Sequence, residues 1–177
     1  MSDSRLPTLL YLLMLAFGLL HWAHRYPQLP NVMASHFAAD GAPNGWQPKF
    51  VFFLLTSLVI AVTAIPTFLV PRKMAMLSPD KINLPNKAYW LAPEQRDETW
   101  RFVAAYMAWF GCGLLFVLLY GISQAINANL PAVGHFNSQR MWRVLVGFAL
   151  FVIVWLIHLL RHFYKVPSSS SSPSPTS

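Results

Sequence analysis

The segment FVFFLLTSLVIAVTAIPTFLV, residues 50–70, decides the fold class of this chain. It contains no Asp, Glu, Lys or Arg, and about 20 apolar residues are enough for a helix to cross the hydrocarbon core of a bilayer. Three further segments share this character: residues 6–24, 102–125 and 144–160. All four are apolar nearly all round, whereas helices of a soluble bundle carry polar outer faces. The sequence therefore predicts an all-α integral membrane protein with four transmembrane helices, in one membrane domain over residues 1–166.

The overall composition agrees with a membrane protein. Of the 177 residues, 55% are apolar and 11% are charged, whereas an average soluble domain is about a quarter charged. The net charge of +7 does not indicate a nucleic-acid partner, because the basic residues flank the apolar segments. The single cysteine, Cys112, has no partner for an intrachain disulfide and leaves the compartment undetermined.

The first apolar segment, residues 6–24, also has the basic flank of a signal peptide. It ends in HWAHRYP, which lacks a small-x-small cleavage pattern, and it is longer than the apolar core of a typical signal. We therefore expect it to be retained as a transmembrane helix.

The distribution of Lys and Arg predicts the orientation, because the more basic side faces the cytoplasm. The N-terminus, the second loop and the C-terminus hold nine of them: Arg5, Arg72, Lys73, Lys81, Lys87, Arg96, Arg101, Arg161 and Lys165. The first and third loops hold four: Arg25, Lys49, Arg140 and Arg143. Both termini are thus expected inside and the first loop outside. Residues 167–177, rich in Ser and Pro, are expected to form a disordered tail.

The outward loop contains SHFAADGAPNGWQPK, residues 35–49, which is turn-rich and polar. Asp40-Gly41 and Asn44-Gly45 are typical turn sequences, and Trp46 suits the headgroup region. A tight connector explains the Gly, Pro and Trp residues, but it does not require Ser35, His36 or Asp40. We interpret this loop as the candidate binding surface, with these residues: Ser35, His36, Asp40, Asn44, Trp46 and Lys49.

The cytoplasmic loop ends in NLPNKAYWLAPEQRDETWRF, residues 83–102. Pro93 suits the first turn of a helix, and Glu94 lies near the positive end of the helix dipole. We expect a helix from Pro93 to about Ala125, longer than the bilayer core and projecting into the cytoplasm. The short apolar stretch before it, residues 89–91, is either an interfacial anchor or an epitope for a cytoplasmic partner. The candidate contacts are Asn86, Tyr89, Trp90 and Arg96.

Histidines are the main candidates for metal or proton chemistry. His158 and His162 share a helix face, but they also suit the bilayer interface. On the outward side, a metal site or proton switch could use four residues: His21, His24, His36 and Asp40. The chain has no HExxH, GxSxG or phosphate-loop motif, and no charge at mid-membrane depth. We therefore predict no catalytic residues, no metal and no cofactor.

Small residues on the third span indicate close helix packing. Ala104, Ala108 and Cys112 recur every four residues, a pattern that brings helices together within a chain, in a homo-oligomer or with a membrane partner. In the second span, Pro66 is expected to bend the helix, and Thr63 is placed to satisfy a freed carbonyl.

The outward stretch LPNVMASHFAADGAPNGWQPK resembles the signature of a bacterial membrane domain-of-unknown-function family, number sixteen forty-eight. The matching positions are Leu29, Pro30, His36, Phe37, Gly41, Pro43, Asn44, Gly45, Trp46 and Lys49. The domain also occurs in SdpI-like proteins, which are linked to immunity against a secreted killing factor and to membrane-level signalling. The resemblance implies a multi-pass protein of the bacterial inner membrane, and it covers the first two spans and their loop.

Three functional hypotheses follow from these observations. The favoured one is a non-catalytic sensing, binding or immunity-type protein that acts through its outward loop on a protein or peptide ligand. The second is a membrane enzyme or metal-dependent factor that uses the outward histidines. The third is an accessory subunit that packs against a larger membrane complex.

Overall fold

The computed structural model describes residues 4–132 and 134–165 and contains four helices long and apolar enough to cross a membrane. These are α1 (Arg5–Arg25), a continuous rod of α2 (Lys49–Ala64), η2 (Ile65–Leu69) and α3 (Val70–Ala75), then α5 (Pro93–Ala128) and α6 (Ser138–Tyr164). The four spans predicted from hydropathy are thus confirmed as helices. The tail expected at residues 167–177 lies outside the described residues.

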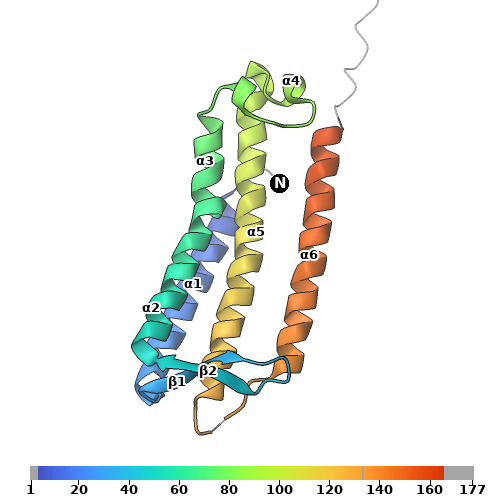
Figure 1. Cartoon of the computed structure of the whole chain (residues 1–177). Coiled ribbons are helices and arrows are strands. Elements are labelled where there is room, and N and C mark those ends of the chain that lie inside the picture. Colours follow the sequence, from blue (N-terminus) through green and yellow to red (C-terminus); the bar gives the residue numbers. More distant parts are fainter. Residues whose placement is uncertain (1–3, 133, 166–177) are drawn as a thin grey trace, which may run out of the picture.

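Helix α5 is the centre of the bundle, with α1 and the α2–α3 rod on one side and α6 on the other (Figure 1). It has 36 residues and is therefore about 54 Å long, well beyond the roughly 30 Å hydrocarbon core. The helix expected from Pro93 to about Ala125 is confirmed and ends three residues later. Small residues on its buried face, such as Ala108 and Cys112, allow close packing on the neighbouring helices.

The second span is distorted at Pro66, as expected. Proline has no backbone N–H to donate, and the chain responds with a π-helical turn over Ile65–Leu69. Two threonine hydroxyls bond to carbonyls here: Thr63 Oγ1 donates to Ile60 O at 2.7 Å, and Thr67 Oγ1 donates to Thr63 O at 2.9 Å. Thr67 is buried and faces Gly111 of α5, so the distorted turn lies at the contact with the central helix.

Helix α6 packs on α5 mainly through aromatic side chains. Trp155 Nε1 donates to the carbonyl of Tyr106 at 3.2 Å, and the Tyr106 hydroxyl lies 2.6 Å from His158 Nδ1. No residue in the most apolar stretch of α6 is buried, because the helix stands at the edge of the bundle (Figure 1). Most of its surface is therefore available to lipid or to another chain.

The two ends of the bundle differ. One end, here called the α4 end, carries η3 (Pro79–Lys81) and α4 (Lys87–Trp90). The other, called the hairpin end, carries η1 (Tyr26–Gln28) and two antiparallel strands, β1 (Val32–Phe37) and β2 (Pro43–Pro48). The all-α expectation is therefore corrected at this point: the fold is mostly helical, but the first loop is a β-hairpin because its backbone pairs strand to strand.

The contact between Gly111 and Thr67 gives a test of the central packing. A Cβ at Gly111 would lie 2.5 Å from both Thr67 Cγ2 and Thr67 Oγ1, and Thr67 is held by its bond to Thr63 O. We expect Gly111→Ala to lower the free energy of unfolding by about 1–3 kcal/mol, the usual cost of overpacking. Unfolding of the purified protein in mixed detergent micelles, followed by circular dichroism, measures this.

Gly147→Ala is the matched control, because a Cβ at Gly147 meets nothing within 4 Å. Alanine is a better helix former than glycine, so this variant is expected to unfold no earlier than the wild type. Equal loss of stability in both variants would contradict the packing described for Gly111.

Candidate functional site

The tip of the hairpin is a turn built around Asp40 and Gly41. Ala38 N donates to Ala42 O at 2.8 Å, and the Asp40 carboxylate accepts from Ala42 N at 2.9 Å. Gly41 has φ +91°, a conformation that L side chains rarely adopt, and a Cβ there would lie 2.6 Å from Phe136 O. The turn expected at Asp40-Gly41 is thus confirmed, and the Asp40 carboxylate stabilises that turn.

The prediction of a turn at Asn44-Gly45 is wrong. Both residues lie within β2, and Gly45 is opposite His36 of β1, next to an irregularity in the pairing. A Cβ at Gly45 would lie 3.0 Å from His36 Cβ and Cδ2, so the glycine leaves space for the imidazole ring. The Asn-Gly pair is typical of turns, but here its glycine accommodates a cross-strand neighbour.

Asn129, at the end of α5, fixes the hairpin to the bundle. Its side-chain amide forms two hydrogen bonds with the buried backbone of Ala34: Ala34 N donates to Oδ1 at 2.7 Å, and Nδ2 donates to Ala34 O at 2.8 Å. Nδ2 also donates to Ala125 O at 2.8 Å, which orients the amide on its own helix. The amide therefore pairs with the N–H and C=O of Ala34 as the backbone of a neighbouring strand would. Sequence analysis missed Asn129, because the contact joins residues 95 positions apart.

Two apolar contacts strengthen this docking. Met33 of β1 is completely buried in the main core of the protein. Phe37 stacks on Phe136 of the α5–α6 connection, with ring centroids 4.5 Å apart. The hairpin is therefore held at its strand, through Asn129 and Met33, and near its tip, through Phe136.

Asp40 stabilises the tip of the hairpin. The other five residues predicted to bind a ligand fall into two groups. Ser35 and Lys49 are half-buried and bond within the chain: Ser35 Oγ donates to Gly45 O at 3.5 Å, and Lys49 Nζ donates to Leu29 O at 3.2 Å. The side chains of His36, Asn44 and Trp46 are exposed, and Trp46 retains 60% of its accessible surface. The exposed group is the surface that a ligand would meet.

The histidines of the hairpin end do not form a cluster. His24 and His36 are both exposed, whereas His21 lines a cavity between α1 and α5. Within residues 4–132 and 134–165, no three side chains of His, Cys, Asp or Glu come together in a way that could hold a metal ion. The geometry thus gives no support to the metal-dependent hypothesis.

At the α4 end, Asn86 and Trp90 cap the C-terminus of α6. Asn86 adopts a left-handed conformation, φ 51°, and its Nδ2 donates to Phe163 O at 3.0 Å and Tyr164 O at 3.1 Å. Trp90 Nε1 donates to Phe163 O at 3.0 Å. The last carbonyls of a helix lack intrahelical partners, so these bonds satisfy groups that are otherwise unpaired.

His162 of α6 lies between two aromatic rings of the same end. Its centroid is 3.8 Å from that of Phe102 and 4.7 Å from that of Trp90. His158, one turn earlier, is bonded to the hydroxyl of Tyr106 instead. The i,i+4 spacing of His158 and His162 therefore reflects two separate packing roles.

Arg96 caps the C-terminus of α3, which also ends at the α4 end. Its Nη2 donates to Ala75 O at 3.0 Å and Leu77 O at 2.6 Å, at the C-terminus of α3, where a cation also suits the helix dipole. Of the four residues predicted to contact a partner, Asn86, Trp90 and Arg96 donate to carbonyls within the chain. Tyr89 packs edge-on against Trp90, with centroids 4.9 Å apart. Asn86, Trp90 and Arg96 therefore cap helix ends, and contact with a partner stays a prediction.

Comparison with known proteins confirms the family resemblance over part of the chain. Residues 13–61 match the family described as Domain of unknown function (DUF1648). The matched region runs from within α1, through the hairpin, into α2. No curated protein and no solved structure matches the chain.

The two hydrogen bonds between Asn129 and Ala34 give a test of how the hairpin is held. We expect Asn129→Ala to leave the buried N–H and C=O of Ala34 unpaired, at a cost of about 1–3 kcal/mol. Hydrogen exchange should become faster in Val32–Phe37 and Pro43–Pro48, with α1 and α5 unchanged. Asn127→Ala, two residues earlier on the same helix, is the control. Unchanged exchange in the hairpin of Asn129→Ala would show that Asn129 does not hold it.

Proposed function

We propose that this multi-pass membrane protein binds a protein or peptide ligand at the exposed side chains of its β1–β2 hairpin and catalyses no reaction. The observation that carries the proposal is the contrast within the hairpin. Its backbone is fixed by Asn129, whereas His36, Asn44 and Trp46 are exposed. A surface held in one conformation loses little entropy when it binds, which favours recognition.

The family match supports the same region. The matched residues 13–61 contain the whole hairpin and parts of the two helices that lead into and out of it. They exclude α5 and α6, so the hairpin is the distinctive non-helical element of the matched unit. Trp46 supplies an amphipathic ring, and His36 supplies an exposed imidazole with hydrogen-bonding nitrogens. Both suit an amphipathic peptide that reaches the membrane surface, as an immunity-type role requires.

The orientation proposed for this function has the hairpin outside and both termini in the cytoplasm of a bacterial inner membrane. It rests on the nine Lys and Arg residues assigned to the α4 end, against four at the hairpin end. In this arrangement the hairpin meets ligands that arrive from outside the cell. The capped loops at the α4 end then face the cytoplasm.

An accessory-subunit role is the second candidate, and the exposure of α6 favours it. The small-residue row predicted to mediate association is used within the chain: Ala108 is 1% exposed and Cys112 is 6% exposed. Helix α6 has no buried residue in its most apolar stretch. A membrane partner would therefore meet α6 rather than the buried row of α5.

Cysteine labelling tests the proposed orientation. Cys112 is buried, so an introduced cysteine can be read against a low background. With a membrane-impermeant maleimide and intact cells, we expect Asn44→Cys to be labelled and Asn83→Cys to be labelled only after the cells are opened. Both positions are exposed, so accessibility within the protein is matched. The opposite labelling pattern would place the hairpin in the cytoplasm.

A deletion strain tests the proposed ligand class. We expect loss of the gene to sensitise cells selectively to a secreted or membrane-active peptide, and the wild-type gene to restore resistance. Trp46→Ala and His36→Ala should restore less than a tenth of the protection at normal abundance, since truncating a central aromatic contact often costs 2 kcal/mol or more. The readout is the minimum inhibitory concentration of the peptide.

Gln139→Ala, an exposed position at the same end but outside the hairpin, is the control and should restore full protection. Full protection by both hairpin variants would refute the hairpin as the binding surface. Reduced abundance of those variants would assign the residues a structural role instead.

A further inference from the structure

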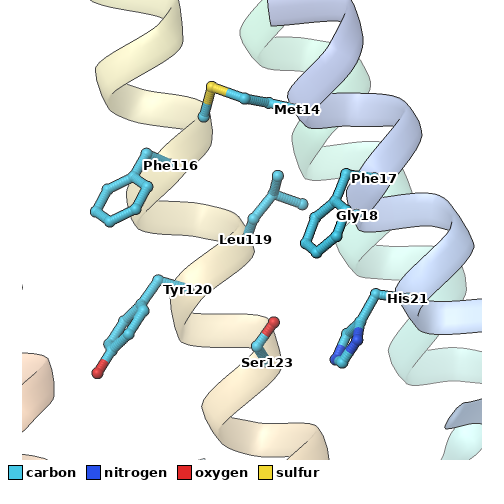
Figure 2. Close-up of a pocket in the computed structure, with 8 residues that line it drawn as sticks. All are labelled: Met14, Phe17, Gly18, His21, Phe116, Leu119, Tyr120 and Ser123. Atoms are coloured by element: carbon cyan, nitrogen blue, oxygen red, sulfur yellow. The ribbon is translucent and has the colours of Figure 1, made fainter.

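A cavity of about 320 Å³ opens between α1 and α5 near the hairpin end (Figure 2). His21 lies four residues before the end of α1, about 6 Å along the helix, and Met14 lies eleven residues before it, about 16 Å. Half of the hydrocarbon core is roughly 15 Å thick. The cavity therefore extends from just inside the bilayer surface to near its middle.

The deeper part of the cavity is apolar and open to lipid. Met14, Phe17, Phe116 and Leu119 line it; in Figure 2, Leu119 lies between the two helices, and Phe116 lies at the outer edge of α5. Phe17 is 73% exposed and Phe116 is 51% exposed, so its rim consists of apolar side chains that face the bilayer. Such an opening admits an acyl chain more readily than a water-soluble ligand.

The part nearer the hairpin is polar. His21, Tyr120 and Ser123 line this part of the cavity. His21 Nε2 is buried and has no hydrogen-bond partner among the described residues, although buried polar groups are nearly always paired. The Tyr120 hydroxyl accepts from Gln124 Nε2 at 2.8 Å, which leaves its own proton free to donate. His21 Nε2, in the tautomer that carries its proton, and the Tyr120 hydroxyl are thus available to donate to an acceptor from outside the chain.

Arg25 adds a positive charge one turn nearer the membrane surface. It is four residues after His21, on the same face of α1. Its Nη1 donates to Gln28 Oε1 at 3.2 Å, whereas its Nε is buried without a hydrogen-bond partner among the described residues. A guanidinium at this level suits a phosphate, which binds Arg through charge-assisted hydrogen bonds. From the middle of the bilayer outward, the cavity thus offers an apolar wall, then hydrogen-bond donors, and then the nearby cation. The acyl chains, ester groups and phosphate of a phospholipid follow one another in the same order.

We propose that this cavity binds one glycerophospholipid of the leaflet at the hairpin end. Its acyl chain lies along Met14, Phe17 and Leu119, and its ester carbonyl accepts a hydrogen bond at His21. Its phosphate lies nearest Arg25. This site is separate from the proposed hairpin surface and does not depend on the ligand of that surface.

The ester group makes the proposal testable with two matched lipids. Purified full-length protein in detergent is titrated with dioleoylphosphatidylcholine and with the corresponding dialkyl ether lipid, and bound lipid is counted by native mass spectrometry. We expect the diacyl lipid to bind roughly 3- to 10-fold more tightly, the value of one hydrogen bond to its carbonyl. His21→Phe should remove this preference, whereas His24→Phe, at an exposed position, should keep it.

Arg25→Gln should weaken both lipids to the same extent, because both carry the phosphate. Equal affinity of the wild type for the two lipids would overturn the proposal, as would a preference that survives in His21→Phe. Should His21→Phe fail to fold, His21→Leu removes the same donor with a smaller side chain. It is then expected to remove the preference for the diacyl lipid, and an unchanged preference would count against the site.

Discussion

The absence of water in the bilayer core is the constraint on which the rest of this structure depends. Every backbone N–H and C=O that is buried away from water, in the bilayer core or at the bundle ends, must find a partner within the chain. Three side-chain groups meet this need at the ends of the bundle. Asn129 pairs with Ala34 of the hairpin, Asn86 and Trp90 bond to the end of α6, and Arg96 bonds to the end of α3. The irregular segments are ordered because these few polar side chains satisfy them.

Within the bilayer, close packing between helices stabilises the fold, whereas capping of helix ends does so at the ends of the bundle. Lipid tails are as apolar as leucine, so helices associate through close fit rather than through removal of apolar surface from water. The buried face of α5 meets this requirement with small residues, and Gly111 receives Thr67 from the π-helical turn of the second span. Thr67 is in turn bonded to Thr63 O, which reduces the cost of placing its hydroxyl in an apolar contact. The distortion at Pro66 thus contributes to the packing of the two helices.

The spans were predictable because hydropathy over about 20 residues is a local property. The start of α5 at Pro93 and the turn at Asp40-Gly41 were predictable for the same reason. The hairpin was not, because its strands have only six residues each and one contains an Asn-Gly pair that is typical of turns. Its docking bond joins Ala34 to Asn129, and the cap of α6 joins Asn86 to Phe163 across 77 positions. Such contacts have no local pattern, so the intramolecular bonds of residues chosen as candidate contacts for a partner could not be predicted.

The hairpin and the cavity between α1 and α5 both depend on one helix, α5. Ser123, which lines the cavity, precedes Asn129 on α5 by six residues, about 9 Å along the axis. The Asn129 amide is bonded both to Ala125 of its own helix and to Ala34 of the hairpin, so β1 is fixed to the end of α5. The lipid proposed for the cavity therefore contacts the same helix whose end holds the hairpin and its exposed His36 and Trp46.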